Sequence, residues 1–134
     1  MDRWTYLFLV SVGAVLVWAY ASVWSAEWVY EDVSNRTAAL TGSTDLRRAL
    51  VHWTWRQTPD AWSAHVINLL AHSTAVLLLV LVARGIGLTR VASASVGVLA
   101  AVSPVMVQSA AYVSGRADVF AVIGILAACL AALR

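Results

Sequence analysis

The sequence has little charge, one cysteine and only two prolines. Of its 134 residues 12% are charged, and its basic residues are all arginine because lysine is absent. Ordinary globular chains carry about 25% charged residues, so this composition excludes a soluble enzyme domain and a disordered segment. Seven glycines without a three-residue repeat exclude a collagen-like fibre. A net charge of +2, spread over separate segments, makes nucleic-acid binding unexpected.

The single cysteine, Cys129, lies inside an apolar run. One cysteine provides neither a disulfide framework nor a CxxC metal or redox motif. We therefore interpret Cys129 as a small residue of the helix core, and the sequence predicts no metal site.

The abundant residues are apolar: 61% of the chain is hydrophobic, and the mean hydropathy is +0.78. Charged residues divide the chain into uncharged runs, and a bilayer core of about 30 Å needs about 20 helical residues. We predict an all-α integral membrane bundle of four transmembrane helices forming a single membrane domain, 1–134. The expected helices cover about 4–26, 61–83, 91–112 and 116–133, with a break near Pro104 in the third.

The first run, 4–26, is expected to be a membrane anchor. It is longer than the 7–15 apolar residues of a signal peptide, although Ala19-Tyr20-Ala21 resembles a cleavage site. Arginine placement then sets the orientation, because short cytoplasmic loops are enriched in basic residues. We predict a multi-pass protein of a bacterial-type inner (cytoplasmic) membrane with both termini cytoplasmic. The basic residues of the inner side are Arg3, Arg84, Arg90 and Arg134.

The outer loop, 27–60, is the only long polar segment. Ser43-Thr44-Asp45 is typical of a helix N-cap, and a stripe of apolar residues follows it at helical spacing. This pattern predicts an amphipathic helix that lies on the outer membrane surface with its apolar side down. The stripe consists of Leu46, Ala49, Leu50 and Trp53.

Three polar residues interrupt the second predicted span. His65, Asn68 and His72 lie within about 60° of one another around a helix. Polar groups in a membrane are costly and either hydrogen-bond neighbouring helices or form a functional site. We favour the first interpretation; a polar site, or ligation of a metal or tetrapyrrole by His72, is the alternative.

Two further groups of polar residues lie at the outer face. In Ser114-Gly115-Arg116-Ala117-Asp118, serine and aspartate suit the start of a helix, while Arg116 beside helix-start N–H groups suits phosphate or lipid binding. Glu31 and Asp32 in the outer loop could supply a general base or a cation ligand, or form a solvated loop.

These segments together resemble one family. Tyr30–Asp32, His65–His72 and Ser103–Asp118 are similar, in this order, to the N-terminal membrane region of C-type (GT-C) glycosyltransferases. The likeness is to the O-mannosyltransferase-like proteins that carry tetratricopeptide repeats, and Ser103–Asp118 is its most specific part. The resemblance implies a catalytic acidic pair at Glu31 and Asp32 and a site contribution from Arg116 and Asp118. It also implies a polyprenyl-phosphate sugar donor on the non-cytoplasmic side.

The chain departs from that family at three points. The first acid is Glu31 where the family usually has aspartate, the outer loop lacks an aromatic-Arg-Pro segment, and four predicted helices are fewer than the family needs. An enclosed, preorganised site is required for transition-state binding. We therefore expect a non-catalytic subunit of a larger membrane complex, respiratory or photosynthetic, built on a reduced glycosyltransferase-like fold. The alternative is the N-terminal half of a split GT-C glycosyltransferase.

The predicted partners are other integral membrane proteins and lipids. Small residues four apart suit close packing of membrane helices. Two such faces are present: Ser93, Gly97 and Ala101 in the third span, and Gly124 and Ala128 in the fourth. The residues require no cofactor; lipid is expected in the grooves, with a tetrapyrrole or carotenoid as the alternative occupant.

Overall fold

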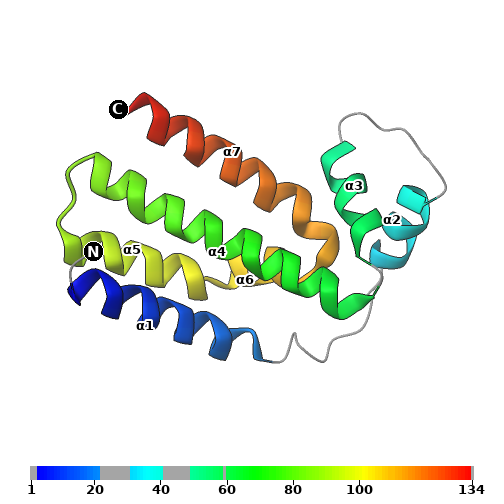
Figure 1. Ribbon diagram of the computed structural model, residues 1–134, viewed down its shortest axis with the longest axis horizontal. Helices are drawn as coiled ribbons and strands as arrows, with labels where there is room; N and C mark the ends of the chain where they lie inside the picture. The colour runs from blue at the N-terminus through cyan, green and yellow to red at the C-terminus, as the bar shows by residue number, and fades with distance from the viewer. Residues whose placement is uncertain (1–2, 22–30, 41–48, 59, 134) are drawn as a thin grey trace.

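The computed structural model describes residues 3–21, 31–40, 49–58 and 60–133, and these are helical with short connections (Figure 1). The all-α class expected from the sequence is confirmed for this part of the chain. The helices in chain order are α1 (Arg3–Ala19), α2 (Glu31–Leu40), α3 (Ala49–Gln57), α4 (Ala61–Gly85), α5 (Arg90–Val102), α6 (Pro104–Ala111), the 3₁₀ turn η3 (Val113–Gly115) and α7 (Arg116–Ala132).

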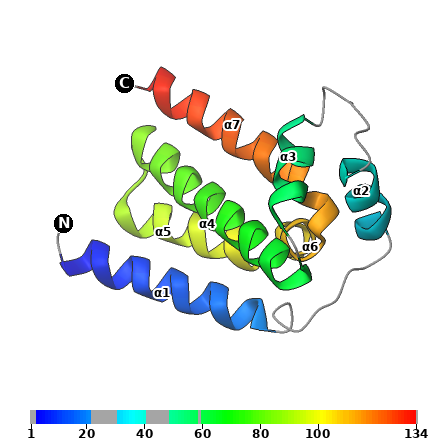
Figure 2. The same cartoon turned by 45° about the vertical axis from the view of Figure 1, so that its right-hand side comes forward.

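The long helix α4 is the centre of the bundle. It packs against α5, α6 and α7, and α1 packs in turn against α5 (Figures 1 and 2). The short helices α2 and α3 pack on each other at the end of the bundle where α4 begins. The opposite end holds the start of α1, the end of α4, the start of α5 and the end of α7.

Local sequence explains where α4 begins and ends. Asp60 is its N-cap, and the Asp60 carboxylate accepts a hydrogen bond from the Ser63 backbone N–H at 2.7 Å. Beyond Gly85 the chain turns at Gly87, whose φ of +95° lies in the left-handed region that glycine adopts without strain. Thr89 then caps α5, because its hydroxyl accepts from the Ala92 N–H at 3.2 Å.

A proline separates α5 from α6. Proline lacks an N–H and disfavours helical geometry in the residue before it. Ser103 accordingly has extended angles, with φ −60° and ψ 128°, and Pro104 occupies the first turn of α6. The helical segment that the sequence predicts over 91–112 is thus two helices in the structure, α5 and α6.

Among the described residues, α4 is the one helix that is long and apolar enough to cross a membrane. Helices α1 and α7 have 17 residues each, which at 1.5 Å per residue is about 25 Å. That length is at the lower limit for a span, so the four-span arrangement stays a prediction.

The outer loop differs from the expectation of one helix. It contains two, because α2 precedes α3. The predicted cap at 43–45 lies outside the described residues. On α3 the inward residue is Trp55, 1% exposed, whereas Trp53 of the predicted stripe is 58% exposed. Trp53, the stripe residue whose side chain the structure describes, therefore faces away from the bundle, and Trp55 joins α3 to the bundle instead.

Candidate functional site

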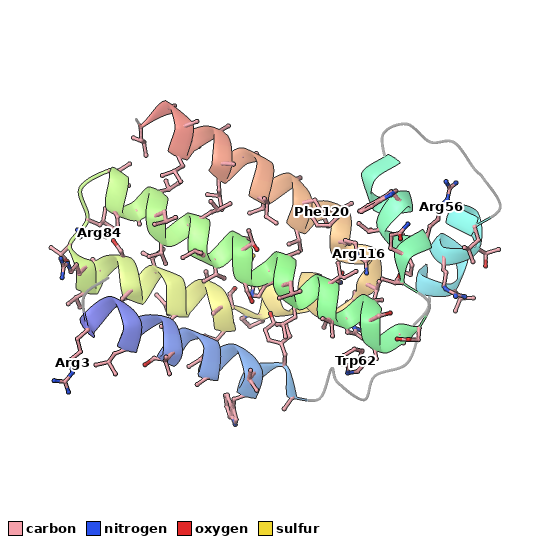
Figure 3. The ribbon with its side chains drawn as sticks, viewed as in Figure 1. Arg3, Arg56, Trp62, Arg84, Arg116 and Phe120 are labelled. Carbon is pink, nitrogen blue, oxygen red and sulfur yellow. The ribbon has the colours of Figure 1, made fainter. Side chains whose placement is uncertain are left out.

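Arg116 opens α7 and is completely buried, at 0% exposure. Its Nε–H donates to the Asn68 side-chain oxygen at 2.8 Å. Its two terminal nitrogens donate to the Thr54 hydroxyl at 2.9 Å and to the Ala64 carbonyl at 3.1 Å. One guanidinium thus joins α3, α4 and α7 at the point where they meet (Figure 3).

Asn68 transmits this contact to a further segment. While its carbonyl oxygen accepts from Arg116, its amide nitrogen donates to the Tyr112 backbone carbonyl at 3.0 Å. Tyr112 is the N-cap of η3, and its carbonyl also accepts from the Gly115 backbone N–H at 3.1 Å. Asn68 therefore fixes the turn that delivers Arg116 into the bundle.

Trp55 covers the guanidinium. The Arg116 carbon Cζ lies 5.1 Å from the centre of the Trp55 ring, which is a cation–π distance. Trp55, Ala64 and Val113 form a buried apolar cluster around this contact. Exclusion of water strengthens both the cation–π contact and the hydrogen bonds of Arg116.

The end of α3 is shaped for these contacts. The Thr58 hydroxyl, 1% exposed, donates to the carbonyls of Trp55 at 3.0 Å and Thr54 at 3.3 Å. These bonds add a side-chain donor at the end of α3, where the Trp55 carbonyl also accepts from the Thr58 backbone N–H at 3.3 Å. The result is a rigid last turn that presents Thr54 and Trp55 toward α7.

Sequence reasoning missed Thr54, Trp55 and Tyr112. The predicted apolar stripe of the outer-loop helix included Trp53 and gave no role to Trp55. The spacing of Trp53 and Trp55 could have indicated a role for Trp55, because residues two apart lie on different sides of a helix, so one of the two rings must face inward.

The predicted acidic pair lies at the same end of the molecule. Glu31 and Asp32 form the start of α2, and α2 packs against both α3 and η3. Their side chains lie outside what the structure describes. Asp118 is in the first turn of α7 and is exposed. The backbone of α2, the Arg116 cluster and Asp118 are therefore gathered around η3.

The polar residues predicted on α4 are all buried, with exposures of 3% for His65, 0% for Asn68 and 1% for His72. The His72 ring hydrogen-bonds the Ala101 backbone on α5 and lies 5.5 Å from the Tyr20 ring at 54°. Within the described part of the chain, His72 Nε2 and the Tyr20 hydroxyl are buried without a hydrogen-bond partner. His72 thus links α4 with α5 and with the end of α1.

A cavity of about 90 Å³ lies beside His72 between α4, α5, α6 and α7. Apart from His72 its lining is apolar. An engineered apolar cavity of about 150 Å³ holds one benzene molecule, so this one has room for a few methylene groups. The lining residues are His72, Ala75, Val76, Leu79, Ala100, Met106, Val122 and Leu126.

Of the two small-residue faces, one is used inside the chain. Ser93, Gly97 and Ala101 are all buried within the bundle, whereas Gly124 and Ala128 on α7 are exposed. The close packing that the first face allows therefore joins α5 to its own neighbours. The face on α7 is exposed, and so is Cys129 next to Ala128, so the expectation that Cys129 is a core residue is wrong.

Comparison of the chain with protein-family models, curated proteins and solved structures finds no match.

Proposed function

We propose that this chain is a non-catalytic, multi-pass integral membrane subunit of a larger membrane protein complex, respiratory or photosynthetic, with both termini cytoplasmic. The carrying observation is the burial of Arg116. In a transferase site this guanidinium would contact a donor phosphate, but here three of its N–H groups donate to Asn68, Thr54 and Ala64. The residue that the motif offers for phosphate instead holds three helices together.

The exterior of the bundle supports a membrane location. Leu70 is 62% exposed, Leu99 68% and Ile125 64%, on three different helices. Soluble monomers rarely expose large contiguous apolar areas, whereas lipid or a partner helix covers them at no cost. The exposed Gly124 and Ala128 on α7 allow the close approach of such a helix.

Native purification in mild detergent, followed by mass spectrometry, tests the proposal. We expect stoichiometric membrane proteins to accompany the chain, and Gly124→Leu to reduce their yield because leucine blocks close helix contact. Gly13→Leu on α1 is the matched control, since a side chain at Gly13, as at Gly124, meets nothing within 4 Å in the chain. Equal losses for both variants, or a chain that purifies alone, would contradict the proposal.

A second function, the N-terminal half of a split GT-C glycosyltransferase, is favoured by one observation. The packing of α2 on η3 brings the helix of the acidic pair to the turn that precedes Arg116 and Asp118. A catalytic acid there needs the Asp32 carboxylate, and loss of a positioned base costs about 10²–10⁴-fold in rate.

The variant Asp32→Asn separates the two functions. In the subunit, complex yield and phenotype are unchanged. In the transferase, sugar transfer from a polyprenyl-phosphate donor is detectable in membranes that hold the chain and disappears with Asp32→Asn. Transfer that depends on Asp32 would replace the subunit proposal with the enzyme.

A further inference from the structure

A buried ring nitrogen on α4 has a lone pair that no described group of the chain uses. His72 is 1% exposed, and within the described part of the chain its Nε2 atom is buried without a hydrogen-bond partner. The hydrogen bond to the Ala101 backbone therefore comes from the other ring nitrogen, Nδ1, which donates to the Ala101 carbonyl. A neutral imidazole that donates from Nδ1 carries an acceptor lone pair at Nε2.

The cavity of about 90 Å³ is bordered by this same ring. The other side chains of its wall are apolar, and three of them, Leu79, Met106 and Leu126, are only half-buried. The cavity is therefore partly open toward the outside of the bundle, where a ligand can enter. His72 lies about 16 Å along α4 from Ala61, at 1.5 Å per residue, which is well inside a span.

The size and polarity of the cavity restrict what can occupy it. By proportion with an apolar cavity of about 150 Å³ that holds one benzene molecule, this cavity has room for about four carbon atoms. A buried water needs two to four polar partners, and the side chains of the wall offer one. A hydrocarbon fills the space but leaves Nε2 without a donor. A molecule with an apolar body and one hydroxyl satisfies both the space and the nitrogen.

We propose that the cavity binds a small uncharged alcohol, whose hydroxyl donates to His72 Nε2 and whose aliphatic body of about four carbons lies against the apolar wall. The route of entry rests on the proposed membrane location. A hydroxyl dissolved in the hydrocarbon region lacks a hydrogen-bond partner, so it gains one when it moves from lipid into the cavity. An alkane of the same shape gains no such bond. Selectivity for the alcohol therefore follows from Nε2.

The test titrates the purified full chain in phosphatidylcholine nanodiscs with trifluorobutanol, fluorinated at the carbon farthest from the hydroxyl, and follows binding by fluorine NMR. The matched probe is trifluoropentane, in which a methyl group replaces the hydroxyl, and empty nanodiscs give the background from partitioning into lipid. We expect saturable binding, with the alcohol bound about fivefold more tightly, because one net hydrogen bond contributes about that factor. Equal affinities for the two probes, or signals that match those of empty nanodiscs, would overturn the inference.

Two variants separate the hydrogen bond from the space. His72→Leu removes the acceptor, so the affinities for the two probes should differ by less than about twofold. Ala100→Leu keeps His72 but fills the cavity, and it should weaken both probes more than about tenfold, because each excluded methylene is worth about fourfold. Ala127→Leu is the control, since Ala127 is exposed on α7 and does not line the cavity. A preference kept by His72→Leu, or equal losses with Ala100→Leu and Ala127→Leu, would overturn the inference.

Tyr20 provides a further control. Its hydroxyl is also buried without a partner among the described groups, and its ring lies 5.5 Å from the His72 ring, but Tyr20 does not line the cavity. Tyr20→Phe should therefore change both affinities by less than about twofold. A larger gain in alcohol affinity would show that the Tyr20 hydroxyl occupies Nε2 in the membrane, and it would overturn the assignment of Nε2 to a ligand.

Failure of this inference is distinguishable from failure of the proposed function. Alcohol binding is measured on the isolated chain, whereas the subunit proposal depends on proteins that accompany it. A chain that binds the alcohol selectively but purifies without partners would keep the cavity site and lose the subunit proposal.

Discussion

Arg116 is the residue on which the junction of α3, α4 and α7 most depends. A buried guanidinium is costly unless protein groups replace the water it has lost. Here the replacements are an amide oxygen, a hydroxyl and a backbone carbonyl, with the Trp55 ring beside them. The same bonds satisfy Asn68 and Thr54, which would otherwise be buried polar groups themselves.

Removal of Arg116 should therefore destabilise the chain. We expect Arg116→Ala to lower the free energy of unfolding by about 2–4 kcal/mol, because three buried acceptors lose their donor. Arg116→Lys should recover only part of the loss, since an ammonium lacks the planar fork of donors. The measurement is unfolding of the detergent-solubilised chain by sodium dodecyl sulfate, followed by circular dichroism.

Exposed Arg56 provides the control for this prediction. Arg56→Ala should change the free energy of unfolding by no more than about 0.5 kcal/mol. If Arg116→Ala were equally mild, the hydrogen bonds at the junction of α3, α4 and α7 would contribute little, and Arg116 would be available for another role.

His72 should have a smaller effect. Leucine at this position fills the space but loses the hydrogen bond to the Ala101 backbone and the ring contact with Tyr20. Hydrogen bonds between membrane helices average about 0.6 kcal/mol, so we expect His72→Leu to cost about 1 kcal/mol. Visible absorption of the natively purified complex is the second measurement: stoichiometric loss of a chromophore in this variant would show that His72 is a ligand.

At the scale of elements, the connections between helices restrict the residue type most strongly. The turn after α4 needs a left-handed residue at Gly87, and the α5–α6 break needs a residue that cannot continue a helix. Each is a case in which one side-chain type, glycine or proline, sets the direction of the following helix.

Gly87→Ala should destabilise the chain by about 1 kcal/mol, because alanine at φ +95° is strained although nothing lies within 4 Å to clash with it. Gly13→Ala is the control, since Gly13 lies inside α1 and its surroundings are equally open. Alanine favours a helix interior, so this variant should be neutral or more stable. Equal midpoints in the same unfolding titration for the two variants would contradict the assigned conformation of Gly87.

The same elements show which parts of the fold can be predicted from the sequence alone. The all-α class follows from hydropathy, and charged residues bracket α4, the longest helix. Helix α2 was missed because Glu31–Leu40 is polar and was assigned to a loop, although two acids at its start suit a helix N-terminus. The partners of Arg116 could not be predicted, because contacts 48 to 62 residues apart depend on how helices pack.

At the scale of the whole molecule, the two ends differ in chemistry. Arg3, Arg84 and Arg90 lie at one end of the bundle, whereas α2, α3 and the start of α4 lie at the other end, where Trp62 is 58% exposed. Basic residues favour the cytoplasmic side of a membrane and tryptophan favours interfaces.

The topology that follows can be measured with reporter fusions. Reporters fused after Arg134 and in the loop between Arg84 and Arg90 should report the cytoplasm, and one near Gly42 the outside. An external reporter after Arg134 would mean that α7 does not span. An external reporter between Arg84 and Arg90 would invert the predicted orientation of the bundle in the membrane.

The contacts of Arg116 also determine when the junction of α3, α4 and α7 can form during synthesis of the chain. Thr54 is synthesised 62 residues before Arg116, which at 5–20 residues per second is about 3 to 12 seconds. During that interval Asn68 and Thr54 have not yet met their guanidinium partner, and α3 has no link to α7. The end of the molecule that holds α3 is therefore completed late, and a chaperone or insertase acting on the nascent chain would meet α3 and α4 before Arg116 joins them.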